Sequence, residues 1–285
     1  MCRPDITAAL RLHWKDGVVP WPFVRLQGEV ASKGKSYEEQ KKQAISYLHY
    51  LLQARPDLYV AQDLLFFEND VIFYFGICGE GIRHFDVEWE DQDLNKFLYA
   101  FIYHLYEPGH FADPTHTETE LDEETMARYT IKITRPGGMT ECRGFYPIYA
   151  RNPFATRTHI LSNPNFSDDL TILKDQYCRV KRRFEELTIL NEYVHKPERV
   201  PGVVVAAYGE RIESPVSKKR CKHRLGLGES ESPFTSIPTL SKVLETLFDV
   251  RKVFKSPLRS DLLTCFAKYC SICGSTAKSF IAILA

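Results

Sequence analysis

The sequence predicts an α+β protein, in which an N-terminal α/β module precedes a mostly antiparallel sheet. Two amphipathic helical segments and several strand-like runs fall within the first 110 residues. A second series of short strand-like runs begins at Arg128, with turns containing proline and asparagine between them. The chain has 285 residues, of which 44% are hydrophobic, so its length and composition are sufficient for a packed core.

Composition also excludes some classes of protein. The 37 basic residues balance the 37 acidic residues, which argues against a dedicated nucleic-acid binder. The first residues hold no apolar run long enough for a signal peptide, and no stretch is long enough for a membrane helix. Without an export signal, the eight cysteines are expected to be reduced thiols. We therefore expect an intracellular protein of the cytoplasm or nucleus, with no membrane contact and no specific nucleic-acid partner.

The first strand is expected at residues 20–32, PWPFVRLQGEVAS, where apolar residues partly alternate. Ser36 and Glu39 then predict a capping box, because the serine can bond an amide one turn on while the glutamate reaches back. The following helix, at residues 38–53, has an apolar face at helical spacing. That face consists of Ala44, Tyr47, Leu48 and Leu51.

Three strand-like runs follow, at residues 58–67, 71–78 and 81–89. Short polar or glycine-containing breaks separate them, which predicts an antiparallel meander. The glycines before the third run open a strand and not a helix, so they predict a hairpin turn in place of a nucleotide loop. A second amphipathic helix is expected at residues 93–106.

The order of Asp16, Glu29, Gln43 and Tyr47 resembles the core of the PD-(D/E)XK nucleases. The resemblance implies an acidic pair that binds a divalent metal, and a lysine two residues after the glutamate. Ala31 stands at the lysine position. Three interpretations stay open for this module: an active nuclease, a degenerate nuclease-like scaffold, and an unrelated α/β module.

Four ranges describe the expected domain organisation. Residues 1–110 form the N-terminal α/β module, and residues 111–127 form an acidic linker that is expected to be exposed. Residues 128–254 form a second module, and residues 255–285 form a divergent tail. The strands of the second module are expected at 128–134, 144–150, 156–162 and 170–174.

Lys174 ends the last of these strands, and a charged helical segment carrying Glu186 follows it. ILKDQY, RRFEELTIL, VPGVVV and the run at 232–254 together resemble the fungal-type protein kinase family, over roughly residues 20 to 254. The resemblance implies a protein-kinase-like N-lobe, made of an antiparallel sheet and a C-helix, followed by an incomplete C-lobe. It also implies ATP and Mg²⁺ as cofactors, with Lys174 on the phosphates and Glu186 orienting Lys174. The alternative is a strand that runs into a solvated helix.

Two departures from the kinase pattern predict that this chain does not phosphorylate protein serine or threonine. Pro153 and Phe154 stand where the family has its glycine-rich loop. The sequence has no asparagine after Asn191 and no D-F-G, so we expect the chain to be truncated before the catalytic loop. The alternative function is a non-catalytic interaction module, which binds a protein partner through its N-terminal domain.

Two further features carry competing interpretations. Cys270 and Cys273 have the spacing of a zinc knuckle, and Cys221 and His223 could complete a set of four ligands; buried thiols are the alternative. The basic run at residues 217–224 is expected to be a solvated loop, with nuclear import or an anionic partner as the alternatives.

Overall fold

The computed structural model describes residues 4–9, 19–31, 34, 36–121, 127–135, 138–166, 170–181, 186–194 and 205–228. Strands dominate this part of the chain and helices are fewer, which confirms the α+β class. The chain divides into two compact units. The first comprises Met1–Phe166, Leu173–Arg182 and Glu210–Arg224, and the second comprises Ser167–Ile172, Arg183–Gly209 and Leu225–Ala285.

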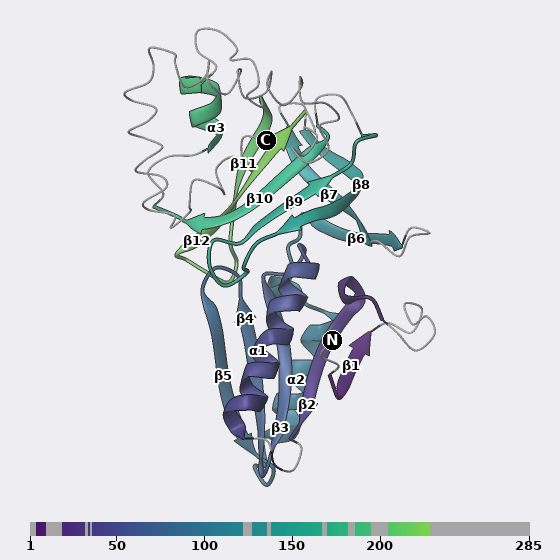
Figure 1. Ribbon diagram of the computed structural model, residues 1–285, viewed down its shortest axis with the longest axis vertical. Coiled ribbons are helices and arrows are strands. Elements are labelled where there is room, and N and C mark those ends of the chain that lie inside the picture. Colours follow the sequence, from purple (N-terminus) through teal and green to yellow (C-terminus); the bar gives the residue numbers. More distant parts are fainter. Residues whose placement is uncertain are drawn as a thin grey trace, which may run out of the picture. The chain divides into compact units, whose positions relative to one another are not determined.

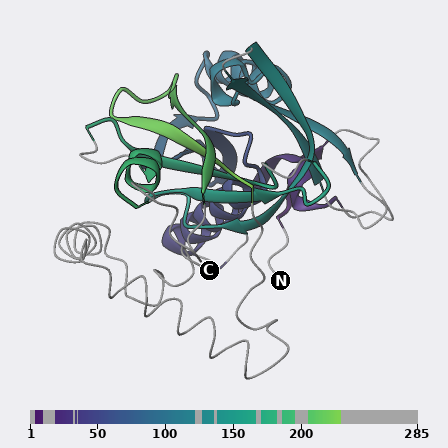
Figure 2. The same cartoon turned by 90° about the horizontal axis from the view of Figure 1, so that it is seen from above.

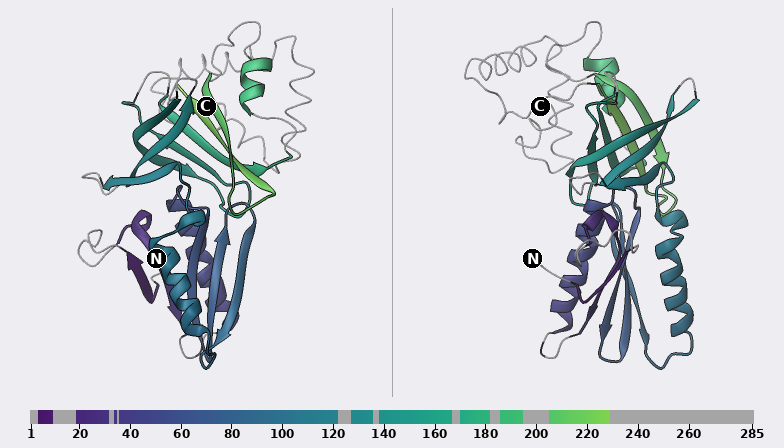
Figure 3. Two further views of the ribbon diagram at one scale, coloured as in Figure 1. Left: turned by 180° about the vertical axis from the view of Figure 1, so that it is seen from behind. Right: turned by 90° about the vertical axis from the view of Figure 1, so that its right-hand side faces the viewer.

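Within the described residues, the N-terminal part of the first unit is a five-stranded sheet with a helix on each face (Figure 1; Figure 3). β2 and β3 are parallel, and the other neighbours are antiparallel, so the predicted meander of β3 to β5 is confirmed. A parallel pair needs a crossover, which α1 (Tyr37–Ala54) supplies, whereas α2 (Leu94–Tyr106) covers the opposite face. The strands, in their order across the sheet, are β1 (Ile6–Ala9), β2 (Val24–Val30), β3 (Val60–Phe67), β4 (Asp70–Ile77) and β5 (Gly81–Glu88).

Local sequence determines where α1 begins. Ser36 is the N-cap, and its hydroxyl accepts a hydrogen bond from the Glu39 amide at 3.4 Å. In return, the Glu39 carboxylate accepts a hydrogen bond from the Ser36 amide at 2.9 Å. The predicted capping box is therefore confirmed, and it satisfies two of the amides that a helix N-terminus leaves without intrahelical acceptors.

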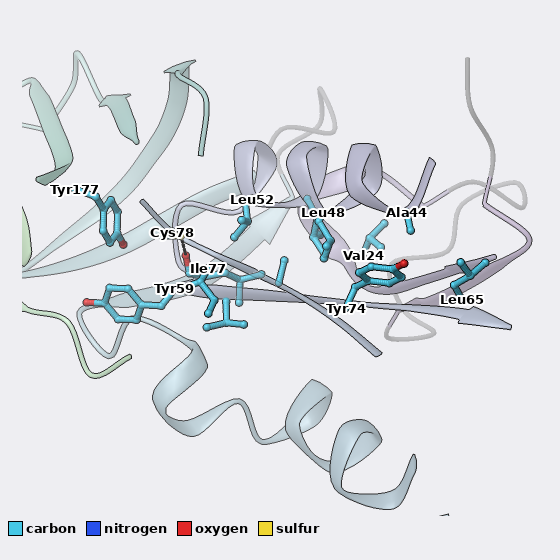
Figure 4. Close-up of a cluster of buried hydrophobic side chains, with 14 of the residues drawn as sticks. Val24, Ala44, Leu48, Leu52, Tyr59, Leu65, Tyr74, Ile77, Cys78 and Tyr177 are labelled. Carbon is cyan, nitrogen blue, oxygen red and sulfur yellow. Dashed lines mark hydrogen bonds between the residues drawn. The ribbon is translucent and has the colours of Figure 1, made fainter. Parts of the chain in front are cut away.

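A hydrophobic core lies between α1 and the sheet (Figure 4). Tyr177, from a strand of the second sheet, belongs to the same core, and its ring lies 5.8 Å from the ring of Tyr59 in an edge-to-face arrangement. The α/β module and part of the second sheet therefore share one interior within the first unit. The apolar side chains that α1 buries are Ala44, Tyr47, Leu48, Leu51 and Leu52, which include all four that the sequence predicted.

The opposite face of the sheet packs on α2 through a second cluster. The Phe73 ring lies 5.4 Å from that of Phe101 and 4.8 Å from that of Phe85, so aromatic contacts connect the helix with β4 and β5. Most of the α2 surface takes no part in this packing and is exposed. The buried members of the cluster are Leu26, Leu64, Val71, Phe73, Val87, Leu94, Phe101 and Leu105.

The second sheet has seven strands in the described part of the chain, drawn from teal to light green (Figure 1; Figure 2). The order across the sheet is β11-β12-β10-β9-β8-β7-β6, so β12 lies next to β10 although β11 precedes it in the chain. The strands are β6 (His116–Leu121), β7 (Ala127–Arg135), β8 (Gly138–Ala150), β9 (Thr158–Ser162), β10 (Ile172–Arg179), β11 (Ala206–Glu213) and β12 (Arg220–Leu227). Two short 3-10 helices cover Trp21–Phe23 and Gly109–Phe111.

The helical segment expected between β10 and β11 is described from Glu186 onward. α3 covers Glu186–Thr188, and a π-helical segment continues it over Ile189–Val194. A helix is therefore present at the predicted position, but it changes its hydrogen-bond pattern within one turn. It packs on a small apolar cluster of the second unit, formed by Leu187, Leu190, Ala206 and Leu225.

The prediction of a solvated loop at residues 217–224 is wrong. β12 begins at Arg220, and both Lys222 and Arg224 are fully buried. A run of charges normally indicates a solvated segment, but here the charges pair with acidic side chains that are distant in sequence.

The exposed linker predicted at residues 111–127 also differs from the structure. Asp113 and His116 are buried, and β6 begins at His116. The same long-range ion pairing draws this acidic segment inward. The expected domain boundaries stay predictions.

Replacing Leu48 with alanine should lower the free energy of unfolding by about 2–5 kcal/mol, because a fully buried leucine is removed and a cavity remains. Lys42→Ala, on the exposed face of the same helix, should change it by less than about 0.5 kcal/mol. Urea denaturation followed by circular dichroism measures both values. Equal effects of the two substitutions would contradict the assigned face of α1.

Candidate functional site

Five buried ionisable side chains form an ion cluster in the first unit: Asp113, His116, Asp175, Lys222 and Arg224. Asp175 belongs to β10, and Lys222 and Arg224 belong to the neighbouring β12. Because side chains alternate along a strand, Lys222 and Arg224 lie on the same face of the sheet. Asp113 and His116 come from the start of β6 and the residues before it.

Every carboxylate of the ion cluster has a cationic partner. Nε and Nη2 of Arg224 each lie 2.8 Å from one oxygen of Asp175, which is a bidentate ion pair. The Lys222 ammonium donates to Asp113 Oδ2 and lies 3.3 Å from Asp175 Oδ2. Buried charges require this pairing, since an isolated ion would lose its hydration without compensation.

His116 is the neutral member of the ion cluster. Its Nδ1 lies 2.9 Å from Asp113 Oδ2, and its Nε2 lies 3.5 Å from Asp175 Oδ2. Burial, together with the positive charge of Arg224, lowers the pKa of His116 to about 4. The imidazole is therefore uncharged near pH 7, and it contributes a hydrogen bond to Asp113 without adding a third cation.

A second buried ion pair, Arg55–Asp57, lies at the C-terminal end of α1. Arg55 Nε and Nη2 lie 2.8 Å and 2.6 Å from the two carboxylate oxygens of Asp57. Burial acts to raise the pKa of Asp57, but Arg55 outweighs it and holds this pKa at about 2.

Arg157 caps the C-terminal end of α1. It donates to the carbonyl oxygens of Leu52 and Arg55 at 2.7 Å and 2.6 Å. These contacts satisfy acceptors that a helix C-terminus leaves open.

The ion cluster contains a group of side chains that could hold a metal. The ligand atoms of Asp113, His116 and Asp175 all lie within 4.8 Å of one another. The Lys222 ammonium, however, contacts both carboxylates of this group. The lysine therefore lies between the two carboxylates that a metal would need to contact, and burial together with the positive charge of Arg224 lowers the pKa of this lysine.

The two residues of the predicted kinase clamp lie in different units. Lys174 is a buried residue of β10 in the first unit, on the strand face opposite to Asp175. Glu186 begins α3 in the second unit and is partly exposed. The clamp between them stays a prediction, and so do ATP and Mg²⁺ as cofactors.

The backbone groups of the turn at the position of the kinase glycine-rich loop are hydrogen-bonded to other groups of the chain. The Phe154 amide donates to Asn152 Oδ1 at 3.0 Å, and the Ala155 amide donates to the Asn152 carbonyl at 3.4 Å. The Pro153 carbonyl accepts from the Gly79 amide at 2.8 Å, and the Phe154 ring packs against the core under α1. These amides are therefore not directed at a phosphate group.

Three of the nuclease-like residues meet on the sheet face that α1 covers. Glu29 of β2 is hydrogen-bonded to Tyr47 and Gln43 of α1, and Gln43 Nε2 lies 2.8 Å from the Tyr47 hydroxyl. Asp63, on the parallel neighbour β3, joins them and was missed by the sequence interpretation, because strand pairing brings it there. Burial raises the pKa of both carboxyl groups. Asp16 lies outside the described residues.

A third polar group joins two residues of the predicted zinc site to one that the sequence interpretation missed. The ligand atoms of Cys178, Cys221 and His223 lie within 4.8 Å of one another. Cys178 belongs to β10 and the other two residues to β12, so the strand order of the sheet brings them together. Cys270 and Cys273 lie outside the described residues.

No model of a known protein family matches the chain, and no curated protein or solved structure is found to match it. The resemblances to kinases and nucleases therefore stay predictions. Among the described residues, no helix is both long enough and apolar enough to cross a membrane.

The stability difference between the wild-type protein and His116→Gln should shrink as the pH falls from about 6.5 to 4. The folded state holds the pKa of His116 at about 4, so in this range the unfolded chain binds a proton that the folded protein does not. The loss amounts to about 3 kcal/mol at most. Urea denaturation at a series of pH values measures it.

The raised pKa values of Glu29 and Asp63 favour the folded state as the pH falls, which opposes the effect of His116. Both proteins contain these two residues, so their contribution to the free energy of unfolding cancels in the difference. His84→Gln, at an exposed position of β5, is the matched histidine control and should follow the wild-type curve. A His116→Gln curve that runs parallel to the wild-type curve would show that His116 is not a buried neutral imidazole.

Proposed function

We propose that the chain is a non-catalytic interaction protein that binds a protein partner through α2. The observation that supports this is a row of four large side chains on the exposed side of the helix, the α2 stripe. Tyr99, Ile102, Tyr103 and Tyr106 are 72%, 48%, 50% and 53% exposed. Their spacing of three and four residues gathers them on one face of the helix.

The chemistry of the α2 stripe fits a protein partner. Tyrosine combines a large apolar surface with a polar tip, and it is enriched among the residues that contribute most to binding energy. The rings of Tyr99 and Tyr103 stack at 6.4 Å with an interplanar angle of 24°. This stacking orders part of the surface before binding, which reduces the entropy that the complex loses.

The partner surface that fits the α2 stripe is an amphipathic helix. α2 has 13 residues and is therefore about 20 Å long, enough to pack along three turns of a second helix. The tyrosine hydroxyls need hydrogen-bonding groups at the edges of that helix. Because the formal net charge of the chain is zero, binding through the stripe depends on apolar contact more than on electrostatic steering.

A photo-crosslinking residue at position 103 should form an adduct with one partner protein in the source cell. The same residue at position 149 should not, because Tyr149 is similarly exposed but lies on β8. The purified partner should then bind the wild-type chain at least about tenfold more tightly than Tyr99→Ser/Tyr106→Ser, since tyrosine is enriched among the interface residues whose truncation costs about 2 kcal/mol or more. Isothermal titration calorimetry measures both affinities.

Equal adducts from positions 103 and 149, or equal affinity of the purified partner for both proteins, would contradict the role of the α2 stripe. An adduct of twice the mass of the chain would identify a second copy of this chain as the occupant, and it would count against a heterologous partner.

A second candidate function, nucleotide binding by a kinase-like fold without phosphoryl transfer, is favoured by the surroundings of Lys174. A buried lysine on a strand, followed by a helical segment and a strand pair that returns β12 beside β10, suits a phosphate-binding lysine of the kinase type. The backbone bonds of the turn around Phe154 argue against a phosphate cradle above it. Under this candidate function, Glu186 orients Lys174 and Mg²⁺ accompanies the nucleotide.

If this second candidate is right, ATP with Mg²⁺ should raise the melting temperature of the wild-type chain but not that of Lys174→Ala, because a ligand that binds only the folded state stabilises it. Lys181→Ala, an exposed lysine just beyond β10, should keep the shift. Differential scanning fluorimetry measures these values, and a phosphotransfer assay should stay negative. An absent shift in the wild-type chain would reject nucleotide binding. Phosphotransfer that Lys174→Ala abolishes would overturn the non-catalytic proposal.

A further inference from the structure

The face of the second sheet opposite to the ion cluster carries two thiols and an imidazole. Cys178 of β10 and Cys221 of β12 lie across from each other: each sulfur is 3.9–4.0 Å from the backbone carbonyl oxygen of the other residue. Cys221 and His223 are two residues apart on the same strand, so their side chains point to the same side. Both cysteines are buried, and His223 is partly exposed.

We propose that Cys178, Cys221 and His223 form a zinc site with three protein ligands and a fourth position open to an exogenous ligand. Two thiolates and an imidazole form a ligand set that binds Zn²⁺ in preference to harder cations. Three protein ligands leave the fourth position of a tetrahedral zinc for water or another exogenous ligand, whereas structural zinc sites are closed by four protein ligands.

The distances are compatible with tetrahedral coordination. Zn–S bonds of about 2.3 Å and Zn–N bonds of about 2.0 Å place the ligand atoms of a tetrahedral site about 3.5–3.8 Å apart. The three ligand atoms already lie within 4.8 Å of one another. Side-chain rotations suffice for the remaining contraction, because neighbouring strands of a sheet hold the backbone in place.

Zn²⁺ must displace protons in order to bind, because burial and the neighbouring Cys178 raise the pKa of the Cys221 thiol to about 11. Zn²⁺ replaces one proton on each sulfur, and two protons leave to solvent. The resulting site, with two thiolates, one neutral imidazole and one dication, has no net charge.

The charged groups that face the thiols from β11 do not change this balance. Arg211 and Glu213 act on Cys221 in opposite directions, and they form an ion pair of 3.0 Å with each other. The ion cluster differs in this respect, because there the Lys222 ammonium contacts both carboxylates of the potential metal group. Lys174 lies on the thiol face of β10, four residues before Cys178, whereas Lys222 and Arg224 lie on the opposite face of β12.

Titration of the reduced, full-length chain with Co²⁺, followed by absorption spectroscopy, tests this site. We expect thiolate-to-metal charge-transfer bands and the visible bands of tetrahedral cobalt, and added Zn²⁺ should remove both. Zn²⁺ should also raise the melting temperature. Cys178→Ser and Cys221→Ser should each weaken the charge-transfer bands, and His223→Gln, at a partly exposed position, should weaken metal binding while circular dichroism shows an unchanged fold.

Cys142→Ser is the matched control, since Cys142 is a buried thiol of β8 and should leave the spectrum unchanged. Three results would overturn the proposal: no charge-transfer band in the wild-type chain, a band that Cys178→Ser leaves intact, or a Cys178–Cys221 disulfide that persists under reducing conditions. Loss of binding in Cys270→Ser/Cys273→Ser together with full binding in Cys178→Ser would assign the metal to the other thiols, and it would also refute the site.

Discussion

The pairing of buried charges in the ion cluster is the constraint on which the first unit depends. Asp113, Asp175, Lys222 and Arg224 are inside the fold, and each would be costly there without its partner. Their pairing fixes three distant stretches of chain with respect to one another: the start of β6, the middle of β10 and the start of β12. An apolar core of the same volume could be as stable, but it would not demand this one arrangement.

The hydrophobic interior and the charges reinforce each other at the end of α1. Arg157 binds carbonyl groups at the helix C-terminus, and Tyr177 packs on Tyr59 beside it. Arg157, which directly precedes β9, and Tyr177 of β10 thus complete the capping and the core of the α/β module. The helix needs this contribution, because its last carbonyl groups are buried and have no intrahelical donor.

The parts of the fold that could be predicted from sequence are the ones that depend on neighbouring residues. The capping box at Ser36, the buried face of α1 and the meander of β3 to β5 each follow from patterns within a few residues. The positions of Asp63 and Cys178 could not be predicted, because they depend on which strands become neighbours. The burial of Lys222 was missed for a related reason: its partner Asp113 is 109 residues away, and a run of basic residues usually indicates solvent.

β12 carries buried charges on one face of the sheet and potential metal ligands on the other, because its side chains alternate. Lys222 and Arg224 point to one side of the sheet, and Cys221 and His223 point to the other. A slip of one residue in the pairing with β10 would exchange the two sides and leave two cations without their carboxylates. The ion cluster therefore fixes the register of β12 on β10. The same register places the two thiols and the imidazole side by side on the opposite face of the sheet. The geometry of the thiol face therefore depends on charge pairing on the other face of the sheet, which the thiols themselves do not contact.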